Sequence, residues 1–333
     1  MASVCVLGAG SWGTAMAILI ARNGHRTLLW GRSKTHMEEL ARDRCNTRYL
    51  PDIPLPDDLE YSSELKRSVR NRDIALIAVP SHAFRSTLRQ SEPFLDRRTR
   101  IAWATKGLDP ESGGLLHETA CQIFSRSRPI AVVSGPTFAK EVARNLPTAM
   151  TIASPDSLFA SDLSEILHNQ RFRVYTSDDI IGVQLGGAVK NVLAIATGAA
   201  DGLGFGANSR SAIVTRGLAE LIRLGLALGA KQETLMGLAG LGDIVLTCTD
   251  NQSRNRRLGI GLGQGRPLEE IIHEIGQEVE GIFAAREIHQ LAARHRIEMP
   301  IAEQVYKVLY EKIAPATAVR NLLVREQKKE QIQ

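Results

Sequence analysis

Several features that define specialised protein classes are scarce in this sequence. Its four cysteines, Cys5, Cys45, Cys121 and Cys248, lie far apart and never form a CxxC pair. That spacing favours neither a zinc site nor a disulfide framework and is typical of a reducing compartment. The eight histidines include no pair at metal-ligand spacing, so we expect no metal centre. No GxSxG motif occurs, so serine-hydrolase chemistry has no support.

Aromatic residues and excess charge are also scarce. Aromatics make up 5% of the chain, and 41 Lys+Arg against 36 Asp+Glu leave a formal net charge of +5. Spread over 333 residues, this surplus does not indicate a nucleic-acid partner unless it is clustered. With 23% charged and 44% hydrophobic residues, the chain is neither disordered nor fibrous, and its length predicts about two globular domains.

The sequence has no long run that is free of charge. The longest weakly charged run, 183–200, carries Lys190 and Asn191 in its middle and several glycines. This composition favours a buried helix of a globular domain over a membrane span. The first ten residues enter apolar sequence without a preceding basic region, which predicts a first strand rather than a secretory signal. We therefore expect a cytoplasmic protein without membrane insertion.

The first half of the chain alternates short apolar runs with polar or helical stretches, the pattern of a doubly wound α/β sheet. Candidate strands are 3–7, 26–30, 73–79, 101–104, 130–134 and 149–153. Between the first two, Ala15, Ile18, Leu19 and Arg22 repeat at helical spacing before the stop signal Asn23-Gly24, which completes a βαβ unit.

Four of these strands end in a short polar or glycine-containing turn, at 8–13, 79–82, 104–107 and 134–137. Because the carboxyl ends of parallel strands form the ligand crevice of an open sheet, we expect these turns to converge. From about residue 180 the periodicity becomes helical. We therefore predict a Rossmann-type domain over 1–181 and an all-α domain over 182–333, with a frayed polar tail at 325–333.

The turn after the first strand is a GxGxxG motif made by Gly8, Gly10 and Gly13. The first glycine permits the tight turn, the second allows backbone to approach a pyrophosphate, and the third lets the helix pack on the strand. The strand–turn–helix context favours dinucleotide binding over a plain glycine-rich turn. The acidic residue that binds an NAD ribose is missing after the second strand, where Gly31-Arg32 stands instead. Arg32 could bind the 2′-phosphate of NADP; the alternative is a solvated surface arginine.

Two charged residues stand alone in apolar sequence. Lys190 is the only charge between 183 and 200, and Asp243 the only one between 237 and 249. Because an unpaired buried charge is costly, we expect them to meet each other or a polar ligand. A buried lysine held by a carboxylate is suited to proton transfer. The alternatives are a lysine extending into solvent and an aspartate in a helix cap. Lys106 follows a strand and is expected to face the crevice; its alternative is an exposed loop lysine.

A polar block follows at 253–257, with one hydroxyl, one amide and three guanidinium groups. No aromatic residue is interleaved and no wider basic stripe accompanies the block, which disfavours nucleic-acid binding. Since these side chains cannot all face one ligand at helical spacing, we assign a phosphate clamp to Ser253, Arg254 and Asn255. We expect Arg256 and Arg257 to be solvated.

The chain resembles the NAD(P)-dependent glycerol-3-phosphate dehydrogenases of bacteria, the soluble biosynthetic type. The similarity extends from Val4 to about Tyr310 and is most specific at 237–257. It is carried by the segments GAGSWGTA at 8–15, NxxYLP at 46–51, VPSH at 79–82, WATKGL at 103–108, SGPTFAKEV at 134–142, GAVKNVLAI at 187–195, DGLGFGANSRSA at 201–212, GLAGLGDIVLTCTDNQSRNRR at 237–257 and VEG at 279–281.

The resemblance implies reversible hydride transfer between NAD(P)H and dihydroxyacetone phosphate, giving sn-glycerol 3-phosphate for phospholipid synthesis, in a homodimer. It implies Lys190 as the proton-transferring residue, with substrate contacts from Lys106, Gly135, Thr137, Lys190, Asp243, Ser253, Arg254 and Asn255. Besides the turn glycines, it implies cofactor contacts from Ser11, Trp12, Arg32, Lys106, Ala139, Arg254, Glu278 and Glu280, with Glu278 acting through its backbone.

Three other functions remain open at this point. A different two-domain dehydrogenase with a helical second domain would act on a sugar acid or a hydroxyacyl substrate, and a carboxylate-specific substrate does not need the clamp at 253–255. An NADP-binding sensor would bind the cofactor without turnover. A nucleic-acid binder would show salt-dependent binding to DNA.

Overall fold

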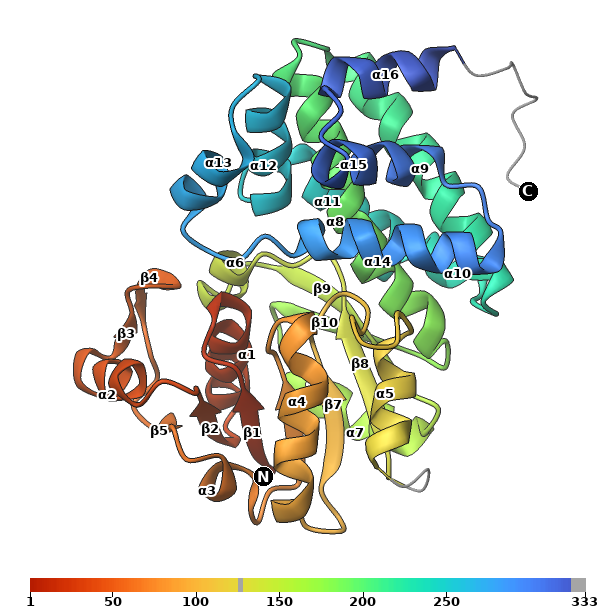
Figure 1. The fold of residues 1–333 in the computed structure, drawn as a ribbon. Helices are drawn as coiled ribbons and strands as arrows, with labels where there is room; N and C mark the ends of the chain where they lie inside the picture. Colours follow the sequence, from red (N-terminus) through yellow and green to blue (C-terminus); the bar gives the residue numbers. More distant parts are fainter. Residues whose placement is uncertain (125–127, 325–333) are drawn as a thin grey trace. The chain divides into compact units, whose positions relative to one another are not determined.

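The computed structural model describes residues 1–124 and 128–324, and these divide into two compact units (Figure 1). Among these residues, unit 1 comprises 1–106, 116–124 and 128–180, and unit 2 comprises 107–115 and 181–324. The segment 107–115, which the predicted domain boundaries place in the first domain, packs within unit 2. The tail expected to fray, 325–333, lies outside the described residues.

Unit 1 is built on an eight-stranded sheet with the order β10-β9-β8-β7-β6-β1-β2-β5. The strands are β1 Ser3–Leu7, β2 Arg26–Trp30, β5 Glu60–Ser62, β6 Ile74–Ile77, β7 Arg100–Trp103, β8 Ile130–Ser134, β9 Thr148–Ala153 and β10 Phe172–Ser177. All six predicted strands are confirmed, three of them with the predicted bounds. A separate antiparallel pair, β3 Cys45–Asn46 and β4 Leu50–Pro54, lies outside this sheet.

The sheet departs from the parallel pattern at one point, because β9 pairs antiparallel with β8. Only the five-residue helix α6, Ala139–Ala143, stands between these strands. At 1.5 Å per residue it rises roughly 7.5 Å, whereas a five-residue strand spans roughly 17 Å. The chain therefore re-enters the sheet from the same edge. The longer helix α7, Ser157–Leu167, carries the chain from the end of β9 back to the edge of the sheet where β9 begins, so β10 runs parallel to β9.

Helices form two groups around this sheet. One group contains α1 Ser11–Arg22, α6 and α7, in which α6 and α7 both pack against α1. The other contains α3 Leu65–Val69, α4 Ser81–Ser91 and α5 Leu116–Ile123, packed in series. The remaining helices are α2 Lys34–Asp43 and the 3-10 turn η1 Glu92–Phe94. The predicted first βαβ unit is confirmed, with α1 ending at Arg22 and capped by Asn23.

The regular elements within the described residues of unit 2 are all helices, joined by loops, as predicted from the change in periodicity. Its helices are α8 Ile180–Gly202, α9 Ala207–Ala227, α10 Gln232–Leu235, the π-turn η2 Leu238–Gly242, α11 Asp243–Thr249, α12 Arg254–Gly263, α13 Leu268–Ile275, α14 Glu280–His295, α15 Pro300–Tyr310 and α16 Pro315–Leu323. Helix α8 is long and apolar enough to cross a membrane, but 89% of its apolar window is buried inside the protein, which is typical of a core helix.

Helices α8 and α12 approach each other closely enough for backbone contact. A Cβ atom on Gly198 of α8 would strike the carbonyl of Arg256, and one on Gly259 of α12 would strike the carbonyl of Ile195. Only hydrogen side chains permit this approach. It places the start of α12 beside the middle of α8, where Lys190 lies.

Candidate active site

The glycine-rich turn of unit 1 is closed on two sides and open on one. Gly8 has a φ of +126°, and a Cβ there would lie 2.7 Å from the carbonyl oxygen of Ala78. A Cβ on Gly13 would collide with the carbonyl of Gly8, whereas one on Gly10 would meet no atom within 4 Å. The open side lies at the start of α1, whose first turn carries no acidic residue. Backbone and helix dipole there suit an anionic phosphate, so the turn fits a dinucleotide.

The four turns predicted to converge lie at one edge of the sheet. They follow β1, β6, β7 and β8, which are adjacent and parallel. Lys106, after β7, donates from Nζ to the carbonyl oxygen of Gly135, after β8, at 3.2 Å. The hydroxyl of Thr137 donates to the same carbonyl at 3.2 Å. Lys106 is therefore not a free loop lysine but is held against the Gly135–Thr137 turn.

The other predicted residues of unit 1 surround this edge. Ser11 donates its hydroxyl to the carbonyl of Tyr49 at 2.7 Å. Trp12 packs partly buried on the core of unit 1, and its indole Nε1 is buried without a partner among the described residues. Ala139 is the first residue of α6. Arg32 follows β2, whose end lies at the same edge of the sheet because β2 is parallel to β1, and Arg32 is exposed.

In unit 2, Lys190 and Asp243 form the predicted buried ion pair. Nζ of Lys190 in α8 lies 2.5 Å from Oδ1 of Asp243, the first residue of α11. Lys190 is 8% exposed and Asp243 fully buried, so the alternative of a lysine extending into solvent is excluded. Thr247, one helical turn after Asp243, donates its hydroxyl to the same oxygen at 3.3 Å. Thr247 was not a predicted site residue, although its i,i+4 spacing from Asp243 could have indicated it.

The three predicted clamp residues stand at the start of α12. Ser253 caps the helix, its hydroxyl accepting the backbone N–H of Arg256 at 3.2 Å. Arg254 is half-buried and donates to Gln277 at 3.4 Å. The amide of Asn255 donates to Asn191, the neighbour of Lys190, at 2.8 Å. Asn255 thus joins the clamp to α8.

Asn255 also reaches α14. Its Oδ1 accepts the backbone N–H of Gly281 at 2.9 Å, next to Glu280. Glu278 and Glu280 are both half-buried, and Glu280 opens α14. The structure therefore brings Lys190, Asp243, Asn255 and Glu280 into one region of unit 2. Asn191, which the sequence motif contained but which was not singled out, supports this cluster.

The prediction of a solvated Arg256 was wrong. Its side chain is 7% exposed and lies 2.5 Å from Asp201, at the end of α8. The close glycine-lined packing of α12 on α8 removes Arg256 from water and supplies the carboxylate that compensates it. Arg257 is exposed, as predicted.

Two further features contribute no chemistry to this cluster. Burial raises the pKa of the Cys248 thiol to about 12, so it is held in the unreactive neutral form. No three His, Cys, Asp or Glu side chains within 1–124 and 128–324 come together in a way that could hold a metal ion.

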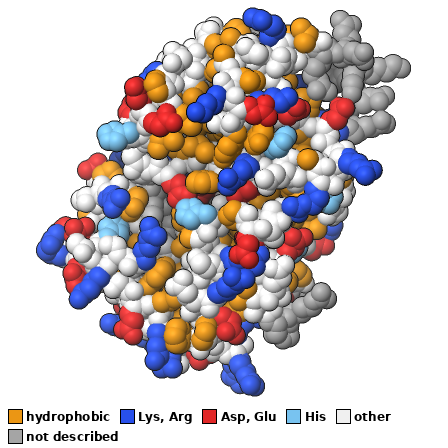
Figure 2. All heavy atoms as spheres, viewed as in Figure 1, with side chains coloured by type: hydrophobic (Ala, Val, Ile, Leu, Met, Phe, Trp, Pro, Cys, Tyr) orange, Lys and Arg blue, Asp and Glu red, His pale blue; other side chains and the backbone are white. Residues whose placement is uncertain are grey.

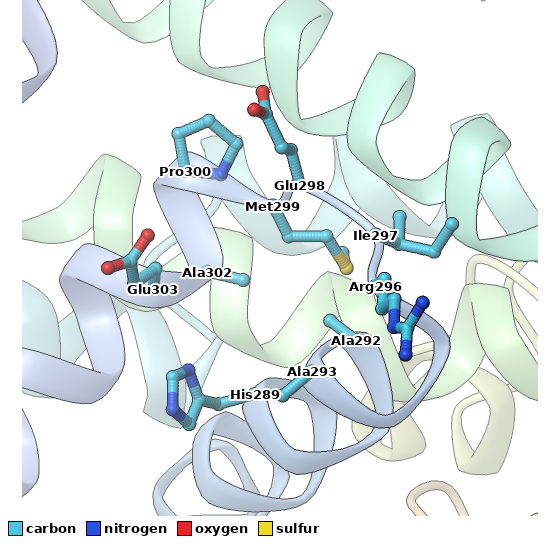
Figure 3. A pocket seen from close by; sticks show the side chains of 10 residues that line it. All are labelled: His289, Ala292, Ala293, Arg296, Ile297, Glu298, Met299, Pro300, Ala302 and Glu303. Carbon is cyan, nitrogen blue, oxygen red and sulfur yellow. The ribbon is translucent and has the colours of Figure 1, made fainter.

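The pocket shown in Figure 3 lies elsewhere, where α14 ends and α15 begins. It has a volume of about 310 Å³, and its wall combines His289, Arg296 and Glu303 with apolar side chains such as Met299. It contains none of the predicted site residues, so the chemistry is assigned to the convergent turns and the Lys190 cluster.

Comparison with known proteins places this chain in a family. Models of the N-terminal and C-terminal parts of NAD-dependent glycerol-3-phosphate dehydrogenase match residues 3–160 and 179–320. The glycerol-3-phosphate dehydrogenases [NAD(P)+] of Methylococcus capsulatus and Aeromonas hydrophila are 58% and 57% identical, each alignment covering 98% of both chains. The crystal structure of glycerol-3-phosphate dehydrogenase from Coxiella burnetii is 51% identical, with a TM-score of 0.95 over 97% of this chain and 99% of that one. The protein belongs to the NAD-dependent glycerol-3-phosphate dehydrogenase family.

Proposed function

We propose that the protein catalyses the reversible NAD(P)H-dependent reduction of dihydroxyacetone phosphate to sn-glycerol 3-phosphate. The buried Lys190–Asp243 pair beside the polar start of α12 is the observation that carries this proposal. It combines a positioned proton donor with hydroxyl, guanidinium and amide groups suited to a phosphorylated substrate.

We assign cofactor binding to residues 1–181. The open side of the turn at Gly10 would hold the pyrophosphate, and Ser11, Trp12 and Ala139 would line the same cofactor. Arg254, Glu278 and Glu280 would contribute from residues 182–333, which we assign to substrate binding and catalysis. When bound, the reduced nicotinamide supplies the hydride.

The chain's own residues would supply the proton and the orientation. The ammonium of Lys190 would give a proton to the carbonyl oxygen of dihydroxyacetone phosphate as hydride adds to the carbon, producing the alcohol and a neutral amine that later regains a proton from water. Asp243 holds the amine in place. Lys106 would polarise the carbonyl, with Gly135 and Thr137 beside it, while Ser253, Arg254 and Asn255 hold the phosphate.

The biological setting follows from the product. We propose that sn-glycerol 3-phosphate made here enters glycerophospholipid synthesis, that the enzyme is cytoplasmic, and that it is a homodimer, the commonest symmetric assembly. The interspersed Lys, Arg, Asp and Glu side chains on the face in Figure 2 give no support to nucleic-acid binding.

The direct test is oxidation of NADPH, followed at 340 nm, with dihydroxyacetone phosphate as substrate and then with NADH. A panel of unphosphorylated 2-oxo acids serves as the comparison. We expect turnover only with the phosphorylated ketone. Turnover of the oxo acids alone would identify a different dehydrogenase, and tight NADPH binding without any turnover would identify a sensor.

We expect Arg32→Ala to lower the preference for NADPH over NADH about tenfold or more, because a charge-assisted contact to the 2′-phosphate is lost. The measurement is the dissociation constant of each cofactor. Arg26→Ala is the matched control, since Arg26 is an exposed arginine at the start of β2, whereas Arg32 follows the end of this strand. An unchanged ratio of the two constants in Arg32→Ala would make Arg32 an ordinary surface residue.

A further inference from the structure

Asn46 is buried beside the glycine-rich turn, although it belongs to a different part of unit 1. It stands in the segment NxxYLP at 46–51, at the end of β3, and is 0% exposed. Neither the turn motif nor the proposed chemistry accounts for a buried amide at this position. A buried amide is retained at low cost only if its hydrogen-bonding groups find partners.

Both acceptors of the Asn46 side-chain amide belong to the turn or to the start of α1. Its Nδ2 donates to the carbonyl oxygen of Ala9 at 3.1 Å and to the hydroxyl of Thr14 at 2.8 Å. Ala9 lies between Gly8 and Gly10, and Thr14 lies in the first turn of α1. The Asn46 amide is therefore hydrogen-bonded to the chain on both sides of Gly10.

A second link closes a ring of hydrogen bonds. Oδ1 of Asn46 accepts the backbone N–H of Tyr49 at 3.3 Å, and the carbonyl of Tyr49 accepts the hydroxyl of Ser11 at 2.7 Å. The turn is thus fixed from the β3–β4 side by Asn46 and from the sheet side by the close approach of Gly8 to Ala78. Without these contacts, the Gly8-Ala9-Gly10 backbone would be ordered only when the cofactor binds, and the entropy lost at that step would weaken binding.

We propose that Asn46 is a positioning residue for cofactor binding, holding the backbone of the glycine-rich turn in the conformation that receives the pyrophosphate. It does not touch the cofactor in this role but acts through Ala9 and Thr14. The inference rests on the proposed function, in which that turn binds NAD(P)H.

The test compares Asn46→Ala with Asn23→Ala by the dissociation constant of NADPH, measured by calorimetry. Asn23 is the matched control, because its amide anchors the opposite end of α1 through the carbonyl of Ile166 at 2.9 Å. We expect binding to weaken about tenfold in Asn46→Ala, since two turn contacts are lost, and to stay within about twofold in Asn23→Ala. In steady state, KM for NADPH should rise while KM for dihydroxyacetone phosphate stays unchanged.

Equal weakening in both variants would reveal general destabilisation of α1 and overturn the inference, as would unchanged binding in Asn46→Ala. If Asn46→Ala does not fold, Thr14→Val decides the matter, because it removes one acceptor of the Asn46 amide while keeping the side-chain shape. Weaker NADPH binding in Thr14→Val supports the inference, and unchanged binding overturns it. Failure of the unaltered protein to bind NADPH would instead remove the proposed function, and this inference with it.

Discussion

Lys190→Met should lower turnover of dihydroxyacetone phosphate by at least about 100-fold, because the proton donor to the developing alkoxide is lost. Binding of NADPH should persist, since the glycine-rich turn of unit 1 is untouched. The measurements are single-turnover rates at saturating substrate and the dissociation constant of NADPH. Turnover close to that of the unaltered enzyme would remove Lys190 from the mechanism.

The variant needs two controls, because it also removes the ammonium partner of a fully buried carboxylate. Breaking such a pair from one side costs about 3–5 kcal/mol of stability. The double variant Lys190→Met with Asp243→Asn removes the isolated charge, so it should recover stability without recovering turnover. Lys307→Met breaks a more exposed ion pair, 2.6 Å from Glu303 in α15, and should leave turnover unchanged.

Local sequence patterns predicted the inner strands of the sheet, the turns that follow them and the buried ion pair. The apolar runs of β1, β6, β7 and β8 were recognisable because these strands are buried on both faces, and their terminal turns reached one sheet edge as parallel strands require. The pairing of Lys190 with Asp243 followed from the cost of burying either charge alone.

The two edge strands of the sheet escaped prediction for a physical reason. Strand β5 has three residues, and β10 exposes Arg173, Tyr175 and Thr176, so neither shows the apolar run of an inner strand. The burial of Arg256 could not be foreseen either, because it depends on how closely α12 approaches α8 through Gly198 and Gly259, which lie far apart in the chain. Contacts between residues so far apart in the chain produce no local sequence pattern from which they could be predicted.

Asn46 illustrates the same limit within the candidate site. The segment around it was recognisable by resemblance, but its role depends on hydrogen bonds to residues more than 30 positions away. The GxGxxG motif identifies the glycine-rich turn in the sequence. Only the fold shows the hydrogen bonds through which Asn46 holds its backbone.

Glu287 offers a second large effect, this time on stability. It is a buried carboxyl in α14, whose Oε2 accepts the backbone N–H of Leu108 at 3.3 Å while Oε1 has no partner among the described residues. Burial raises its pKa from the ordinary 4.5 to about 7, opposed by the Leu108 N–H and Arg286 and assisted by Asp109 and Glu280. The segment 107–115, which directly follows Lys106, is thus hydrogen-bonded to α14 through the Glu287 carboxyl, whose raised pKa favours the protonated form.

Because the folded pKa lies above the unfolded one, the native state binds more protons between about pH 4.5 and 7. Below about pH 4.5 the Glu287 carboxyl is protonated in both states and does not lower the free energy of unfolding. As the pH rises to about 7, the unfolded state loses the proton first, and the free energy of unfolding falls progressively. Above about pH 7 the loss reaches up to about 3 kcal/mol. Glu287→Gln stays neutral, so its free energy of unfolding should gain about 2–3 kcal/mol relative to the unaltered protein between pH 5 and pH 8.

Urea unfolding at four pH values from 5 to 8 measures this difference. Glu269→Gln, at an exposed position of α13, controls for the loss of one negative charge and should follow the unaltered protein. A constant difference between Glu287→Gln and the unaltered protein across this range would show that the carboxyl titrates alike in the folded and unfolded chains. A widening difference would instead show that the anchor of the segment after Lys106 is a carboxyl that folding keeps protonated near neutral pH.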